Sequence, residues 1–190
     1  DKPEFPRLFM KSQQSMIGHG QELVRPKVSD QFDFEGEFAV VIGKPGRYIA
    51  KENWKDYIAG YTIIMDGSIR DFQKRSVDQG KNFYHSSSSG PWLITMDEVP
   101  EDFRDMKLTT RLNGKVMQAS DLGKLCFDVS DLISYYSQIF YFQPGDMIAT
   151  GTPGGVGSRR DPPVWMKPGD ELEVEITGIG ILKNAVVGEN

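Results

Sequence analysis

The stretch D-F-E-G-E-F-A-V-V-I-G-K, residues 33–44, predicts a strand at the centre of the fold. Read with the two-residue period of a strand, Glu35 and Glu37 share one face with small apolar residues, and Phe38 begins a second apolar face. A strand that is apolar on both faces is normally buried on both. Ionised carboxylates at such a place are costly unless a partner balances them. The alternative is a strand end that emerges into solvent and carries ordinary surface acids.

A second apolar stretch ends in a third acid. Residues 57–65 are rich in aromatic and β-branched side chains and stop at Asp66-Gly67-Ser68, which is typical of a buried strand ending in a turn. If the two strands lie side by side, Glu35, Glu37 and Asp66 come together. Three carboxylates without histidine or thiolate form an oxygen site suited to Mg²⁺, Mn²⁺ or Ca²⁺ rather than zinc.

A short helix is expected directly after Asp66, with Ser68 as its N-cap. It carries Arg70 and Gln73 close to the same point. Backbone N–H groups at a helix start, together with these side chains, can hold a ligand that bears a carboxylate. The alternative for Arg70 is a salt bridge with Asp71 or another nearby acid.

The glycine-rich segment 151–157 offers a second set of donors. It lacks the Lys-Ser/Thr ending of a phosphate-binding P-loop, and no helical pattern follows it. We expect the Gly151 backbone and the Thr152 hydroxyl to hydrogen-bond an anionic group of a ligand. The alternative is a β-turn that uses glycine for positive φ.

Three further patterns complete the secondary structure. The serine run 86–89 predicts a mobile surface loop and lacks the glycine-flanked context of a nucleophile. Asn113-Gly114 predicts a hairpin turn. Apolar residues at helical spacing predict a helix that is capped by Asp128 or Ser130 and continues through Phe140.

The composition indicates the number of domains, the fold class and the kind of partner. A chain of 190 residues with 20 Gly and 11 Pro indicates a single β-rich domain. With Lys+Arg 22 against Asp+Glu 27 the net charge is -5, which favours a small-molecule partner over nucleic acid or an anionic membrane. Because there is no apolar run of membrane-spanning length, no signal peptide and only Cys126, we expect a cytoplasmic protein.

In this order the segments resemble the fumarylacetoacetate hydrolase family over residues 8–187. The resemblance implies an α+β, mostly β fold, a mixed β-sheet roll with a few short helices, and a homodimer. It implies Mg²⁺ or Mn²⁺, with Ca²⁺ as a substitute, on Glu35, Glu37 and Asp66. It also implies catalytic Lys81 and Gln73, and a substrate site at Arg70, Gly151 and Thr152. The matching pieces are 35–44, 60–73, 80–83, 90–92, Asn113-Gly114 with Gln118, 144–146 and 150–157.

The resemblance implies chemistry on a small 2-oxo or diketo acid. Our first hypothesis is hydrolytic cleavage of a C–C bond in an acylpyruvate-type substrate; the alternatives are decarboxylation or enol/keto isomerisation at the same site, or a non-catalytic ligand-binding relative. Relatives that form pyruvate carry a His/Glu pair on a lid that activates water. Because residues 1–30 contain no such pair, we expect a single catalytic domain, residues 1–190, that lacks an N-terminal segment and lid, or a protein that does not use one. His19 and His85 are the remaining candidates for a base.

Overall fold

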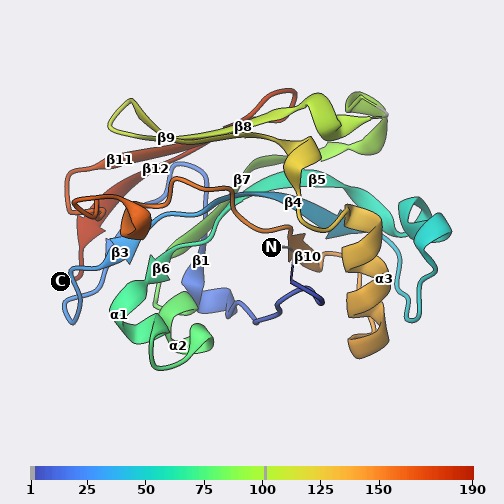
Figure 1. Ribbon diagram of the computed structural model, residues 1–190, viewed down its shortest axis with the longest axis horizontal. Helices are drawn as coiled ribbons and strands as arrows, with labels where there is room; N and C mark the ends of the chain where they lie inside the picture. Colours follow the sequence, from blue (N-terminus) through green and yellow to red (C-terminus); the bar gives the residue numbers. More distant parts are fainter. Residues whose placement is uncertain (1–2, 101) are drawn as a thin grey trace.

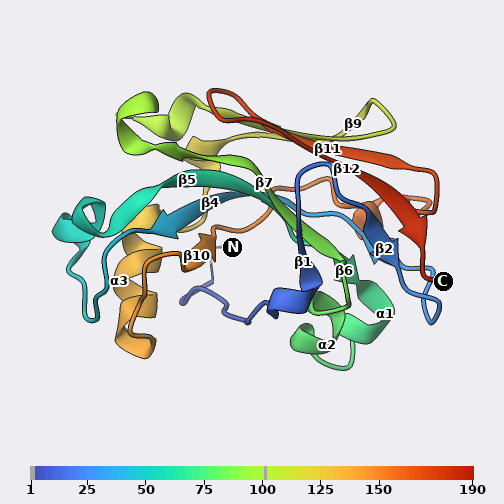
Figure 2. The ribbon, with the colours of Figure 1, turned by 180° about the vertical axis from the view of Figure 1, so that it is seen from behind.

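The computed structural model describes residues 3–100 and 102–190 as two five-stranded sheets and a two-stranded ribbon (Figures 1 and 2). The first sheet has the order β1 (Met16–Gly18), β7 (Ser87–Thr95), β5 (Ile58–Met65), β4 (Gly36–Ile42), β10 (Met147–Ala149). The second has the order β2 (Leu23–Arg25), β12 (Gly180–Gly188), β11 (Glu171–Ile176), β8 (Lys107–Leu112), β9 (Lys115–Asp121). The ribbon pairs β3 (Phe32–Asp33) with β6 (Ser68–Ile69).

The pairing confirms the expected mixed, mostly β fold. β1 with β7 and β2 with β12 are parallel, whereas β4 lies antiparallel between β5 and β10. β8 and β9 form the predicted hairpin, and Asn113 and Gly114 take the positive φ values, 51° and 75°, that its tight turn requires. The stretch at residues 33–44 therefore supplies a central strand of the first sheet.

The two sheets pack closely at Gly36. A Cβ atom at this position would lie 2.3 Å from Thr110 Oγ1 on β8 and 2.9 Å from Val174 Cγ1 on β11. This face of β4 therefore lies against the second sheet, and by strand alternation Phe38, which is fully buried, points the same way. Glu37 consequently projects from the opposite face of the first sheet.

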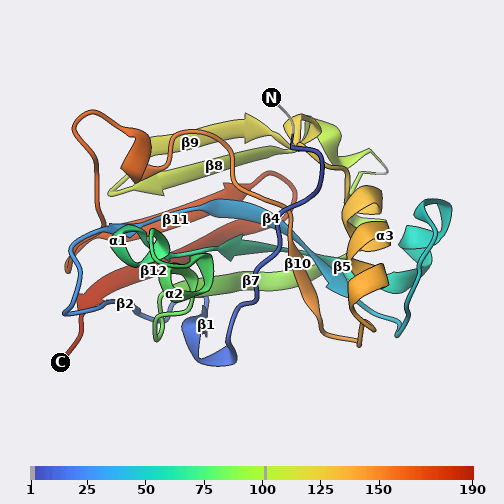
Figure 3. The ribbon, with the colours of Figure 1, turned by 60° about the horizontal axis from the view of Figure 1, so that its bottom comes forward.

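Helices flank that opposite face. α1 (Arg70–Gln73) and α2 (Val77–Lys81) lie at one end, and α3 (Val129–Ile139) lies at the other, as Figures 1 and 3 show. The N-terminal segment, residues 3–12, runs between them, with the Tyr136 hydroxyl of α3 donating to the Arg7 carbonyl at 2.9 Å. None of the helices in the described part of the chain has the length and apolarity needed to cross a membrane.

Two local predictions are wrong and one is confirmed. Ser87, Ser88 and Ser89 are not a surface loop but the first residues of β7, and Ser87 and Ser88 are fully buried. Ser68 does not cap a helix, because it pairs with Asp33 in the ribbon and α1 begins after Ile69. α3 begins after Asp128, whose side chain forms a capping box with Asp131.

Candidate metal centre

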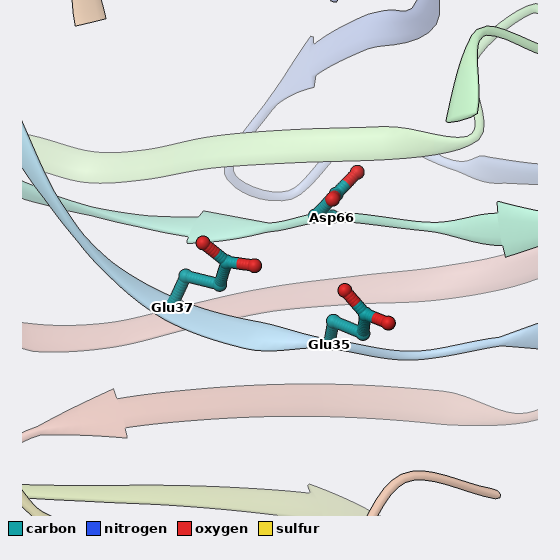
Figure 4. Close-up of side chains that lie close together, drawn as sticks. All are labelled: Glu35, Glu37 and Asp66. Carbon is teal, nitrogen blue, oxygen red and sulfur yellow. The ribbon is translucent and has the colours of Figure 1, made fainter. Parts of the chain in front are cut away.

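The three acids predicted from the sequence meet at one point. Glu35 precedes β4, Glu37 lies in β4, and Asp66 follows the neighbouring strand β5 (Figure 4). One carboxylate oxygen from each lies within 4.8 Å of the other two. Antiparallel pairing explains the convergence, since Gly36 is opposite Met65 and each residue is next to an acid. Glu37 and Asp66 are buried, with 4% and 2% of their surface exposed.

Two lysine ammonium groups lie against these carboxylates. Lys81, at the end of α2, places Nζ 2.6 Å from both Glu35 Oε2 and Asp66 Oδ2. Lys11, in the N-terminal segment, donates to Asp66 Oδ1 at 2.9 Å, to Ser87 Oγ at 2.7 Å and to the Lys81 carbonyl. Burial alone would lower the pKa of Lys81, but Asp66 and Glu35 raise it above its ordinary value. Lys81 is therefore a cation in this site.

Glu37 is the carboxylate left without a cation. Among the described residues no ion pair includes Glu37, and its Oε2 accepts a hydrogen bond from the Gly151 N–H at 2.7 Å. Burial, reinforced by the charges of Asp66 and Glu35, raises the pKa of Glu37 to about 8. The ion pairs around it join Lys11, Lys81 and Arg70 to Asp33, Glu35 and Asp66.

This donor set fits a divalent cation. Three carboxylates that repel one another, of which Glu37 and Asp66 are buried and Glu35 is partly buried, have oxygens within 4.8 Å and supply the hard ligands that Mg²⁺, Mn²⁺ and Ca²⁺ prefer. Glu37 has no cationic partner among the described residues, and burial raises the pKa of its carboxyl, so a bound cation would balance its charge.

Arg70 and Gln73 border the same site from α1. Arg70 Nη2 lies 2.7 Å from Glu35 Oε1, and Nη1 donates to Gln73 Oε1 at 2.8 Å. The third partner of Arg70 is Asp33, whose Oδ2 accepts from Nε at 2.8 Å. Arg70 therefore pairs with Asp33 and Glu35 and not with Asp71, which accepts from the Ser29 hydroxyl.

The glycine-rich segment closes another side of the site. The Gly151 N–H binds Glu37, and the Thr152 hydroxyl donates to the Gly36 carbonyl at 3.0 Å and accepts from Gln118 Nε2 at 2.8 Å. Gly151 also has φ 100°, so the alternative role of glycine, positive φ, applies here as well. The structure thus brings both residues to the edge of the carboxylates.

The two histidines contact other elements. His19 is exposed and its Nδ1 accepts from the backbone N–H of Lys183 in β12. His85 has φ 49° and stacks on the Tyr84 ring. Within the described part of the chain, neither side chain forms a hydrogen bond or ion pair with Glu35, Glu37 or Asp66.

Sequence reasoning missed Lys11, Asp33 and Ser87 as members of this site. Lys11 stands in a short polar-apolar segment without a periodic signal, and Ser87 belongs to a run that resembles a loop. Asp33 did carry a signal, because it lies between two phenylalanines that the structure buries completely. An acid flanked in this way is buried and must find donors.

Fold and site together define a class: mixed β-sheet proteins with a buried carboxylate cluster suited to a divalent cation. The chain matches the family described as fumarylacetoacetate (FAA) hydrolase C-terminal over residues 1–187, and it belongs to that family. The expected family is therefore confirmed.

The relatives carry names that refer to different reactions. The chain is 40% identical to the oxaloacetate tautomerase Fahd2a of Rattus norvegicus, over 97% of this chain and 60% of that protein. It superposes on a putative HpcE protein of Mycobacterium smegmatis with a TM-score of 0.92 and 38% identity, covering 98% of this chain and 69% of the other. It also superposes on maleylpyruvate hydrolase of Sphingobium sp. SYK-6 with a TM-score of 0.85 and 31% identity, covering 96% of this chain and 64% of the other. That structure is a complex with manganese(II) and pyruvate. The chain thus spans about three fifths of the tautomerase's length.

Proposed function

We propose that the chain catalyses enol/keto isomerisation of a small 2-oxo dicarboxylic acid such as oxaloacetate, with Mg²⁺ or Mn²⁺ on Glu35, Glu37 and Asp66. The observation that carries the proposal is the carboxylate cluster with a protonated lysine inside it. The oxaloacetate tautomerase at 40% identity supports this alternative better than our first hypothesis, C–C hydrolysis. Ca²⁺ is the expected substitute for the native ion.

The residues around the cluster have separate tasks. Tautomerisation moves one proton between a carbon and an oxygen of the same molecule and consumes no water. Lys81 Nζ, held as a cation by Glu35 and Asp66, donates a hydrogen bond that stabilises the oxygen on which charge develops. A bound divalent ion would supply Lewis-acid stabilisation of that charge.

Arg70 and Gln73 orient the substrate. A guanidinium has five N–H donors, and three of those on Arg70 bind Asp33, Gln73 and Glu35. The other two are the donors that we assign to the substrate carboxylate. The amide of Gln73, held by Arg70, and the Thr152 hydroxyl, held by Gln118, complete the polar wall.

The experiment mixes the purified protein and Mg²⁺ or Mn²⁺ with enol oxaloacetate and follows the ultraviolet absorbance of the enol. We expect loss of the enol faster than in buffer with the metal alone, abolished by a chelator, while total oxaloacetate stays constant. Release of pyruvate and CO₂ would show decarboxylation instead. An enol decay no faster than the metal control would contradict the proposal.

Hydrolysis is the second candidate, and the structural similarity to maleylpyruvate hydrolase favours it. It requires a base that activates water, a task for which the contacts of His19 and His85 offer no support. Incubation with a panel of acylpyruvates, with product identification, distinguishes the two: a hydrolase releases pyruvate and a carboxylic acid in equal amounts. No turnover of either substrate class, with metal and ligand binding intact, would indicate a non-catalytic relative.

Three expectations stay predictions: one domain, a homodimer and a cytoplasmic location. Light scattering of the purified protein tests the dimer, and limited proteolysis tests the domain. Localisation in the source cells tests the third.

A further inference from the structure

We infer that Asp33 is a positioning residue that fixes the Arg70 guanidinium and joins it to the end of the glycine-rich segment. Nothing in the family similarity assigns Asp33 a task. The inference rests on the proposed function in one respect, namely that Arg70 holds the carboxylate of a 2-oxo acid.

Asp33 is a fully buried carboxylate with an unusual number of donors. Oδ1 accepts from the backbone N–H of Phe34 at 2.9 Å and of Gly157 at 2.7 Å. Oδ2 accepts from the N–H of Ser158 at 3.0 Å and from Arg70 Nε at 2.8 Å. Its exposed surface is 0%, so these four bonds replace the whole hydration of the group.

These donors come from three separate parts of the chain. Phe34 belongs to the segment that leads into β4, Arg70 begins α1, and residues 157–158 lie where the glycine-rich segment ends. The close fit at Gly157 supports a fixed arrangement, because a Cβ atom there would lie 1.9 Å from the Val164 carbonyl and 2.7 Å from Asp33 Oδ1. Asp33 therefore sets the distance between this end of the segment and α1.

The consequence for Arg70 is orientation. A guanidinium is planar, so the bond from Nε to Asp33 and the contact from Nη2 to Glu35 fix both its position and its plane. Without Asp33, Arg70 would keep Glu35 and Gln73 but could rotate about them. Binding of a ligand carboxylate would then include the entropy loss of fixing the Arg70 guanidinium, which in the wild type is already fixed before binding.

The test compares Asp33→Asn with a matched variant, Asp170→Asn. Asp170 is also buried, 5% exposed, and accepts from Lys167 N–H and Asn113 Nδ2, both at 2.9 Å, but lies at the turn before β11. Asparagine keeps the size of the side chain and loses the acceptor that serves Arg70 and Ser158. The probes are Mn²⁺ alone and then oxalate on the Mn²⁺-loaded protein, each measured by calorimetric titration.

We expect Asp33→Asn to weaken oxalate binding about tenfold or more while the Mn²⁺ affinity stays within a few fold, because only the bonds to Arg70 and Ser158 are lost. Asp170→Asn should leave both affinities unchanged. In Arg70→Lys protein, adding Asp33→Asn should cost nothing further, since Asp33 acts through Arg70. An equal oxalate affinity in Asp33→Asn and wild type would overturn the inference. So would a double variant in which the losses of oxalate affinity from Asp33→Asn and Arg70→Lys multiply.

A second measurement decides the matter if Asp33→Asn fails to fold. In ¹⁵N spectra of the wild-type protein the Arg70 Nε–H signal, identified by its absence from Arg70→Lys, should exchange slowly with water before oxalate is added. Fast exchange would overturn the inference. Failure of the wild type to bind oxalate would do the same, whereas intact oxalate binding without action on oxaloacetate would refute only the proposed function.

Discussion

Lys81 Nζ lies 2.6 Å from Asp66 Oδ2, and both groups are almost completely buried. Asp66 follows the long strand β5, whereas Lys81 ends the five-residue helix α2. The pair places a cation among carboxylates that are suited to a metal ion, so metal binding and the charge of the lysine are linked.

Replacement of Glu37 or Asp66 by alanine should abolish stoichiometric Mn²⁺ binding and leave a folded protein. Each change removes one of three converging carboxylates, and the loss should reach about 100-fold in affinity or more. Titration with Mn²⁺ and far-ultraviolet circular dichroism check both parts. The matched control is Glu173→Ala on β11, where Glu173 pairs with Lys183 of the second sheet; stoichiometric Mn²⁺ in either site variant would refute the ligand set.

Replacement of Lys81 by methionine should lower the stability of the metal-free protein more than that of the Mn²⁺-loaded protein. Without metal, Glu35 and Asp66 lose a buried partner, and we expect destabilisation by about 3–5 kcal/mol. Mn²⁺ should restore much of this stability, so the rise in melting temperature on adding metal should be larger than in the wild type. Turnover should nevertheless fall about 100-fold or more, because the hydrogen bond to the developing oxyanion is missing. If Mn²⁺ raises the melting temperature equally in Lys81→Met and wild type, the charge of Lys81 is not linked to metal binding.

The metal-free protein should lose stability as pH rises through the range set by Glu37. The pKa of Glu37 is about 8 in the folded chain against 4.5 for the free group, so the folded state binds the extra proton in between. Stability from this group is therefore complete below about pH 4.5 and is lost as pH rises to about 8. Urea unfolding in a chelator across that range measures the slope.

Glu37→Gln provides the control for this slope, because the amide does not titrate. The variant should show a flatter dependence on pH in the same range. If wild type and variant have the same slope, another group is responsible.

Gly36→Ala should destabilise the protein by about 1–3 kcal/mol through overpacking between the sheets. The new Cβ meets Thr110 Oγ1 at 2.3 Å, so the same change should cost less in a Thr110→Ala background. Gly154→Ala is the matched control, because no heavy atom of the described residues, apart from Gly154 and its two chain neighbours, lies within 4 Å of its Cβ position. Chemical unfolding of the wild type and the four variants measures the difference; an equal cost at both glycines would show that the close approach is unimportant.

The sequence by itself determined the two central strands and the hairpin. Alternation on both faces of residues 36–42 and the apolar run before Asp66 specified two buried strands, and Asn113-Gly114 specified the hairpin. These features are local: a period of two and the φ preferences of asparagine and glycine act within a few residues. Because the three acids stand at the ends of such strands, their convergence followed once the two strands were taken as neighbours.

Only the tertiary structure decided which charged and polar groups meet them. Lys11 reaches Ser87 across 76 residues, and Asp33 reaches Ser158 across 125. Neighbouring side chains do not encode such contacts, so the serine run resembled a loop although pairing with β5 buries it in a strand. Arg70 likewise forms ion pairs with Asp33 and Glu35 rather than with the adjacent Asp71, because residues next to each other on a helix point in different directions. The sheet order brings the partners together, and the desolvation of each buried charge then requires that they pair.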